Sequence, residues 1–315
     1  MKHLSEALKL ALITQGKGER EFHKHCQIKD GLVTATDGVI SSGCQVEESL
    51  DCKPNTELLL AALSKCKKEI NITQVNEKSL SVKSGRFKAT VPCFPIDLPE
   101  CSPDPVFMDC SPGLLKSISR LTSIADKSQN EVYKTVFLKG GAAFSTDGRL
   151  LVEIWHSGNV PKVAIPADSC KRLLKVKGEL SNIGGSKDSI TFYFKDGSWF
   201  KSPLSSSEFP HIDELLNVGS SPQVLTKEMK DGFRAVAPFC ETFIKFESGL
   251  ISSIGPNTSG KSQYEVETCC EDSAFSVSLF SMIMNDITVI DFNTSANLIY
   301  FWGDGMRGAL AKGRL

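Results

Sequence analysis

The chain has 315 residues, of which 41% are hydrophobic and 23% are charged, and its formal net charge is −1. This composition is that of a globular protein with room for about two or three domains, and it excludes a disordered or collagen-like chain. No apolar run reaches the length of a membrane span, and the amphipathic N-terminal segment lacks the apolar core of a signal peptide. We therefore expect a cytoplasmic protein with no membrane partner. Its 11 cysteines, an odd number without a C-x-x-C pair, are expected to stay reduced.

The predicted elements begin with a helix at 5–13, followed by strands that lead to the turn Thr36-Asp37-Gly38. A second helix at 55–68, with Asn55 or Thr56 as its N-cap, precedes a hairpin at 78–92. Asp and Gly are the residues that a tight turn between strands requires. The first third of the chain therefore reads helix, strands, helix, hairpin.

The middle third repeats this order. A helix at 112–124 precedes the turn Thr146-Asp147-Gly148, and a helix at 166–178, with Asp168 behind Pro166 as its expected N-cap, precedes a hairpin at 188–204. The last third is a fainter copy. Its predicted elements are a helix at 226–239, strands at 242–254 and 262–269, a helix at 271–284 and a hairpin at 296–313.

Segments rich in proline, serine and glycine at 98–107 and 215–225 are the expected joins between the copies. We predict an α+β protein made of three tandem copies of one domain, at 1–101, 102–216 and 217–315. Each copy would place two helices on one face of antiparallel sheet.

The middle copy resembles a known family. S-T-D-G-R-L-L at 145–151, the I-P of Ile165-Pro166 and the F-P of Phe209-Pro210 are similar to the A-T-D-G-H-R-L, I-P and F-P-D pattern of the bacterial-type DNA polymerase sliding clamp. The resemblance covers the entire chain and is strongest from Val132 to Leu216. The chain is shorter than typical bacterial members, which is consistent with a divergent, viral version acting in an infected host cell.

In that family, two subunits of three clamp-type domains form a ring around duplex DNA. The resemblance therefore implies a homodimeric processivity factor that tethers a DNA polymerase to double-stranded DNA of any sequence. It implies no catalytic residues and no cofactor. We expect edge strands of the first and third copies to pair between subunits, because these edges would otherwise be exposed.

Basic residues recur on five of the six predicted helices, although the chain as a whole is slightly acidic. A solvated helix face could carry the same residues, but this asymmetry favours a surface that faces phosphates. The sixth helix, at 271–284, has no lysine or arginine, although its serines could still face DNA. The expected DNA-binding residues are Lys9, Lys65, Lys67, Lys68, Lys116, Arg120, Lys171, Arg172, Lys175, Lys227, Lys230 and Arg234.

The resemblance also implies a pocket between the second and third copies that captures short apolar peptides of the polymerase and the clamp loader. Arg149 stands where the family usually has histidine, and Leu150 where it has arginine, which implies an altered peptide preference. The residues expected to line the pocket are Val132, Thr146, Gly148, Arg149, Leu150, Leu151, Arg314 and Leu315.

One motif favours an enzyme instead. Residues 255–262 fit the phosphate-binding pattern G-x-x-x-x-G-K-[ST], and Asp291 follows an apolar run as a Walker B carboxylate would. A phosphate-binding loop must open a helix, whereas residues 263–268 alternate as a strand. We therefore expect a turn and no enzyme. A P-loop nucleotide hydrolase remains the alternative, beside a clamp-like scaffold that binds proteins without encircling DNA.

A metal site is not expected. His23 and His25 form an H-x-H pair in a segment, 21–28, that alternates as a strand, but no third ligand is evident nearby.

Overall fold

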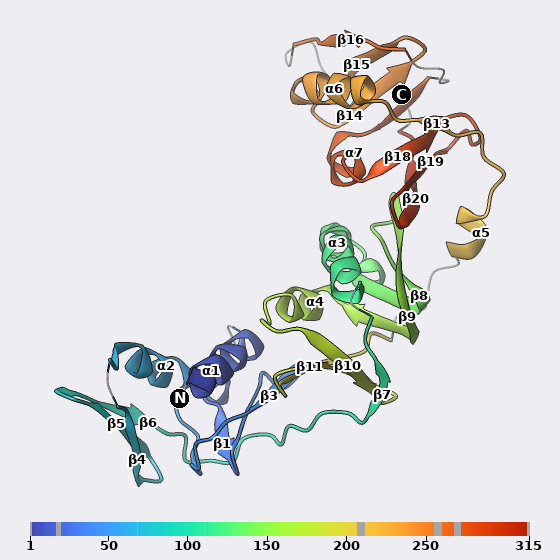
Figure 1. The fold of residues 1–315 in the computed structure, drawn as a ribbon. Coiled ribbons are helices and arrows are strands. Elements are labelled where there is room, and N and C mark those ends of the chain that lie inside the picture. The colour runs from blue at the N-terminus through green and yellow to red at the C-terminus, as the bar shows by residue number, and fades with distance from the viewer. Residues whose placement is uncertain are drawn as a thin grey trace. The chain divides into compact units, whose positions relative to one another are not determined.

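The computed structural model describes residues 2–16, 20–67, 69–111, 113–206, 212–254, 260–267 and 272–313. Helices and antiparallel strands alternate along these ranges, so the expected α+β class is confirmed. None of the helices in these ranges is both long enough and apolar enough to cross a bilayer. The chain divides into two compact units (Figure 1). Unit 1 comprises Met1–Leu115 and Ile165–Ser206, and unit 2 comprises Lys116–Ala164 and Ser207–Leu315.

Unit 1 contains two antiparallel sheets, in the strand orders β1-β2-β3-β12-β11-β10-β7 and β4-β5-β6. Its helices are α1 (Lys2–Gln15), α2 (Thr56–Lys65), α4 (Ala167–Leu173) and the 3-10 helix η1 (Glu21–Lys24). Its strands are β1 (Gln27–Lys29), β2 (Leu32–Thr36), β3 (Ser41–Gln45), β4 (Asn71–Asn76), β5 (Ser79–Ser84), β6 (Phe87–Pro92), β7 (Val106–Asp109), β10 (Leu180–Gly185), β11 (Ser189–Phe194) and β12 (Trp199–Pro203).

The core of unit 1 forms where α1 and α2 pack together and α1 covers β2 and β3. Leu4, Leu8 and Ala11 recur at helical spacing on α1 and are buried together with Leu59 and Leu63 of α2. The helix α2 begins where expected, because the side chain of its N-cap residue, Asn55, accepts a hydrogen bond from the backbone N–H of Leu58 at 3.0 Å.

A direct strand pair joins the first and middle copies in unit 1. β3 pairs with β12, and Gly43 lies opposite Trp199. A Cβ atom at Gly43 would lie 2.5 Å from the Trp199 ring, so only glycine allows this close approach.

Unit 2 also contains two antiparallel sheets, in the orders β13-β18-β19-β20-β9-β8 and β16-β15-β14-β17. Its helices are α3 (Leu114–Lys127, whose first two residues belong to unit 1), α5 (Ile212–Leu216), α6 (Lys227–Val236), α7 (Val277–Ile283) and the 3-10 helices η2 (Glu131–Tyr133) and η3 (Ala237–Phe239). Its strands are β8 (Thr135–Thr146), β9 (Leu150–Pro166, whose last two residues belong to unit 1), β13 (Gln223–Val224), β14 (Phe243–Glu247), β15 (Leu250–Ile254), β16 (Gln263–Glu265), β17 (Ser273–Ser276), β18 (Ile287–Asp291), β19 (Leu298–Gly303) and β20 (Met306–Ala311).

The middle and last copies are joined in the same way, because β20 pairs with β9. The helix α6 packs on β15 and β16 (Figure 1), with Met229, Phe233 and Val236 buried. A Cβ atom at Gly232 would lie 2.7 Å from the Tyr264 ring of β16, so the helix can approach the sheet only with glycine at this position.

Three local expectations were wrong. The segment expected to be one helix at 271–284 begins with a strand, β17, whose four residues are all buried and pair with β14, and only 277–283 form the helix α7. A short apolar run suits either structure, and pairing with β14 decided it. The segment around His23 turns as the 3-10 helix η1 and not as a strand. Asp168 is not the N-cap of α4; that position is Pro166, and Asp168 lies in the first turn.

Candidate nucleic-acid and peptide surfaces

The two Thr-Asp-Gly turns have the same local geometry. In the second turn, Asp147 Oδ1 accepts hydrogen bonds from the backbone N–H groups of Arg149 and Leu150 at 2.8 and 2.7 Å. Asp37 makes the same two bonds in the first turn, at 2.9 and 2.8 Å, with the residues two and three positions further on. The glycine that follows each aspartate has a positive φ, 88° in the first turn and 92° in the second.

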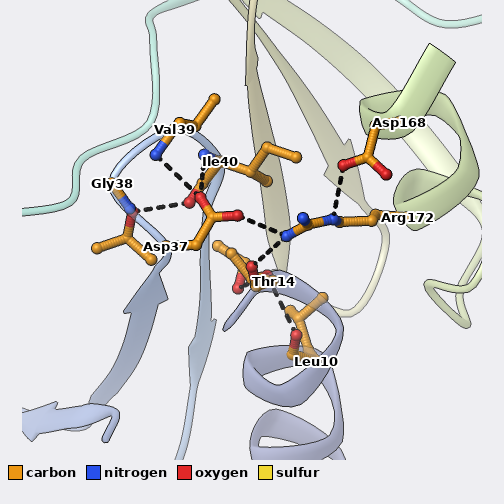
Figure 2. A network of polar contacts seen from close by, with 10 residues as sticks. Leu10, Thr14, Asp37, Gly38, Val39, Ile40, Asp168 and Arg172 are labelled. Carbon is orange, nitrogen blue, oxygen red and sulfur yellow. Dashed lines mark hydrogen bonds and ion pairs between the residues drawn. The ribbon is translucent and has the colours of Figure 1, made fainter. Parts of the chain in front are cut away.

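The first turn is also held by Arg172 of α4 (Figure 2). The Arg172 guanidinium donates to Asp37 Oδ2 at 2.6 Å and to the backbone oxygen of Thr14 at 2.8 Å, and its Nε lies 3.0 Å from Asp168 Oδ2. Thr14 lies in the last turn of α1, where a cation also meets the negative end of the helix dipole. Protein groups bond Nη1 and Nε of the guanidinium, so Arg172 holds this turn in place, and its contact with DNA stays a prediction.

A hollow in unit 1 brings together two of the expected DNA-binding residues. It has a volume of about 130 Å³ and lies between α1, the chain after α4 and the β11–β12 turn. Lys9 and Lys175 lie at this hollow, and so does Lys177, which was not among the expected DNA-binding residues. Lys9 also forms an exposed ion pair with Glu6 at 2.7 Å. The three ammonium groups share the hollow with the carboxylates of Glu6 and Asp196, so a phosphate would compete with these two carboxylates for them.

The other expected residues of unit 1 differ in their surroundings. Lys65 is the last residue of α2 and Lys67 lies beyond its end, and both are exposed. Lys171 is partly buried on α4. Lys68 lies outside the described residues.

In unit 2, the short segment after α7 is bonded to both of the basic helices α3 and α6. Arg120 of α3 forms an ion pair with Asp286, just after α7, at 2.8 Å. Arg234 of α6 donates to the side-chain oxygen of Asn285 at 2.9 Å. The same short segment after α7 thus fixes an arginine from each neighbouring helix.

Some lysines of α3 and α6 are exposed to solvent, and the ammonium groups of others contact protein atoms. Lys116 and Lys227 are exposed. Lys230 donates to the backbone oxygen of Ile287 at 2.8 Å, and Lys127, which the sequence analysis did not include, lies 3.4 Å from the sulfur of Met282. The expected set therefore mixes exposed cations with cations that also hold the helices in place.

The second turn lies beside the C-terminal strand. The backbone N–H of Ala311 donates to the oxygen of Arg149 at 2.7 Å, next to the β20–β9 pair. Val132 is 40% exposed, and Arg149 also faces solvent. Arg314 and Leu315, the other expected wall of the pocket, lie outside the described residues.

Leu150 and Leu151 occupy opposite faces of β9, because neighbouring residues of a strand alternate. Leu151 belongs to a buried apolar cluster with Leu216 of α5, Tyr300 of β19 and Ala309 of β20. Leu150 is fully buried and is not part of that cluster. Leu151, which is 5% exposed, therefore lies on the face where this apolar cluster forms, and Leu150 lies on the opposite face. Thr146 fixes the turn, since its hydroxyl accepts from the Gly148 N–H at 3.0 Å.

Two sheet edges carry opposite charges. β6 is an end strand of its sheet, with Arg86 and Lys88 exposed on or beside it. β16 is an end strand of the sheet in unit 2, with Glu265 and Glu267 exposed on or just after it. Both glutamates line a shallow concavity that also includes Glu228 at the start of α6.

The phosphate-loop motif lies between β15 and β16 in the chain, and its residues 255–259 are outside the described residues. Gln263–Glu265, directly after the motif, form a strand paired with β15, as expected, and not a helix. Asp291 is fully buried, and its carboxylate accepts backbone N–H groups of Ser221, Asn293 and Thr294. These hydrogen bonds make Asp291 a turn anchor.

The sequence matches no protein-family model and no curated protein. The fold, however, is similar to solved structures along its entire length. DNA polymerase III subunit beta from Pseudomonas aeruginosa has a TM-score of 0.82 at 18% identity, with 100% of this chain and 98% of that chain covered. The Bacillus subtilis DNA polymerase sliding clamp has a TM-score of 0.81 at 15% identity, with 100% and 97% covered.

The Helicobacter pylori beta clamp, solved bound to a DNA ligase peptide, has a TM-score of 0.78 at 15% identity, with 99% of this chain and 98% of that chain covered. The chain therefore has the fold of the bacterial sliding clamps. The resemblance seen in the motifs of the middle copy is confirmed at the level of the fold.

Proposed function

We propose that this protein is a DNA sliding clamp, a processivity factor that encircles duplex DNA and tethers the replicative polymerase. The observation that carries the proposal is the likeness to solved sliding clamps, which covers nearly all of both chains. The exposed lysines at the unit 1 hollow and on α3 and α6 support contact with phosphates without regard to base sequence. A replication factor of this kind acts in the cytoplasm of a bacterium or of an infected cell.

The ring would consist of two subunits, each with domains at 1–101, 102–216 and 217–315. We place the subunit contact between β6 of one subunit and β16 of the other subunit, because both strands end their sheets. The exposed arginine and lysine along β6 and the exposed glutamates along β16 are complementary in charge. A head-to-tail contact of this type closes into a ring when the rotation allows it.

Partner proteins would bind through short apolar peptides on the sheet face that carries Leu151. Val132, Arg149, Arg314 and Leu315 are the further residues that we propose for the pocket. The solved Helicobacter pylori clamp with its DNA ligase peptide supports this mode of recognition. We expect the polymerase and the clamp loader to use it in the same way. Arg149, exposed beside the turn, would favour peptides with an acidic residue close to the apolar anchor.

The proposed function involves no chemical step. The strand after Ser262 and the hydrogen bonds that occupy Asp291 support the interpretation of the phosphate-loop motif as a turn. An ATP-binding measurement on the parent protein and on Lys261→Ala tests this directly. Binding by the parent that is lost in the variant would favour the hydrolase.

The function itself is tested by retention on DNA. We expect native mass spectrometry and electron microscopy to show ring-shaped dimers. Once a clamp loader has loaded the protein on nicked circular plasmid, it should co-elute with the plasmid at high salt, and cutting the plasmid with a restriction enzyme should release it. Equal retention on linear and circular DNA would contradict topological binding, and a stable monomer would contradict the ring.

A scaffold that binds proteins without encircling DNA is the second candidate. It is favoured by α7, which carries no basic residue and is followed by Asp286, the carboxylate that neutralises Arg120. Rings that bind apolar peptides but are never retained on circular plasmid would favour the scaffold over the clamp.

A further inference from the structure

Trp155 is the exposed member of the three tryptophans in the chain. Its side chain is 46% exposed on β9, whereas Trp199 is 5% exposed and Trp302 is partly buried against the apolar cluster around Leu151. A tryptophan with a purely structural role would bury most of its large apolar surface. Packing in the core therefore does not explain why Trp155 is exposed on β9, a strand with a neighbour on each side.

The Trp155 ring is held in a fixed position. Its indole N–H donates to Glu153 Oε1 at 3.2 Å, and the Arg307 guanidinium lies over the ring at 5.9 Å from its centroid. Glu153 is 5% exposed and also accepts a hydrogen bond from Arg307. Arg307 in turn donates to the side-chain oxygen of Asn217, just after α5, at 3.1 Å. A partner that stacks on this ring would lose little conformational entropy in ordering it.

The ring lies on the same sheet face as the proposed peptide pocket. Leu151, Glu153 and Trp155 are alternate residues of β9, so their side chains point to one side. Leu151 and Trp155 are four residues apart, which corresponds to about 13 Å along a strand. A peptide anchored over Leu151 and extended along β9 would reach Trp155 about four residues away from its anchor.

The surroundings of Trp155 select for an uncharged, flat partner group. The Glu153 carboxylate and the Arg307 guanidinium neutralise each other, so neither attracts a phosphate or a free carboxylate strongly. β9 lies between β20 and β8 in the sheet, and β20 pairs with it over Leu150–Ile154, so a peptide beside Leu151 cannot add as a strand at that edge. The Arg307 guanidinium lies over the ring, and the 46% of the Trp155 side chain that is exposed can contact a partner group.

We propose that Trp155 is a second anchor point for the partner peptide and stacks on an aromatic or proline residue about four positions from the apolar anchor. This inference rests on the proposed peptide-binding function. It adds how long the bound part of the partner peptide is and where its second anchor residue lies. The platform formed by Trp155, Glu153 and Arg307 then sets which apolar peptides bind tightly.

The test is a selection of displayed random peptides on the full-length protein and on Trp155→Ala. Peptides selected by the parent should carry an apolar anchor and an aromatic residue or proline about four positions away. Those selected by the variant should keep the anchor and lose the second preference. A second preference that persists in the variant, or its absence from the parent, would overturn the inference. If the parent selects no apolar peptide, this result would contradict both the proposed peptide pocket and the second anchor at Trp155.

Affinities of one selected peptide and of a truncated peptide without the second residue provide the quantitative control. We expect Trp155→Ala to weaken the longer peptide about tenfold, Trp155→Phe to restore most of the affinity, and both variants to bind the truncated peptide as the parent does. Circular dichroism and thermal melts check the fold of each variant. Single-stranded oligonucleotide that binds the parent but not Trp155→Ala would assign the platform to nucleic acid and overturn the inference.

Discussion

Arg172, near the end of α4, and Lys175, just after it, have the same charge, but their surroundings differ. Arg172 is bonded to Asp37, Asp168 and the end of α1, and 21% of its side chain is exposed. Lys175 is exposed beside Lys9 at the hollow. A cation whose donors are already bonded to carboxylates has little left to offer a phosphate, so the two residues should affect different properties of the protein.

We expect Arg172→Ala to lower the free energy of unfolding by about 2 to 3 kcal/mol, because it leaves Asp37 partly buried without its partner. Urea unfolding measures this change. The matched control is Lys175→Ala, which should change stability by less than about 0.5 kcal/mol and should weaken the binding of short duplex DNA. An Arg172→Ala protein as stable as the parent would contradict the structural role.

Asp104 connects pH to stability. Burial by itself raises the pKa of Asp104, but the Lys201 ammonium and the hydroxyls of Ser189 and Thr191 together outweigh it and hold the pKa below the usual value. The folded pKa is thus lower than the unfolded one. The carboxylate stabilises the fold above the unfolded pKa of about 3.9, and this contribution is lost as the pH falls through the folded pKa.

We therefore expect Asp104→Asn to be less stable than the parent by about 2 kcal/mol at neutral pH, with a difference that narrows as the pH falls below about 4. Urea unfolding of both proteins across this range measures it. Asp109→Asn, at an exposed position of β7, is the control and should be nearly neutral. A difference that does not depend on pH would show that the ionised carboxylate is not responsible.

Among the elements, α7 differs most from what its sequence indicated. It is short, has no basic residue and follows a strand, yet the segment after it holds Arg120 of α3 and Arg234 of α6. Phe280 of α7 also packs against Phe233 of α6 at 4.9 Å between ring centroids. The helix without positive charge therefore fixes how the basic helices of unit 2 are presented.

Removal of the Asp286 carboxylate should free the Arg120 guanidinium for phosphates. We expect Asp286→Ala to bind short duplex DNA about two- to threefold more tightly at low salt, and the gain should disappear at high salt. Fluorescence anisotropy measures it. Asp304→Ala, at the exposed β19–β20 turn, removes the same charge elsewhere and serves as the control. Unchanged or weaker binding by Asp286→Ala would argue against a DNA-facing surface at Arg120.

At the scale of the whole molecule, the two units do not coincide with the three copies seen in the sequence. The β3–β12 pair joins the first copy to the middle one, and the β20–β9 pair joins the middle copy to the last. The middle copy is therefore shared between the units. Among the strands that end their sheets, β6 belongs to the first copy and β16 to the last, which is the arrangement that the proposed dimer contact needs.

Charge reversal at these edges tests the dimer. We expect the double variant Arg86→Glu, Lys88→Glu to dissociate into monomers at concentrations where the parent is dimeric, because like charges would face each other across the contact. Glu265→Lys, Glu267→Lys should do the same. A mixture of the two variants should form heterodimers, detected by native mass spectrometry or sedimentation.

Lys187→Glu, in the exposed β10–β11 turn, is the matched control and should leave the dimer intact. If both double variants remain dimeric, the subunits do not meet through β6 and β16.

The sequence by itself determined the local elements of this protein. The 3.6-residue spacing of Leu59, Ala62 and Leu63 with an Asn55 cap defined α2, and the Asp-Gly turns defined the hairpins, because caps, turns and periodicity act between residues close in the chain. The repeated Thr-Asp-Gly turns and the basic helices were visible for the same reason.

The tertiary structure alone decided features that depend on pairing between distant residues. β17 became a strand because β14 was available to pair with it. Arg172 took a structural role because Asp37, 135 residues away in the sequence, came within hydrogen-bond distance. Trp155, Glu153 and Arg307 form one platform only because β20 lies beside β9. Such contacts depend on which strands and helices become neighbours, and no local pattern in the sequence encodes that choice.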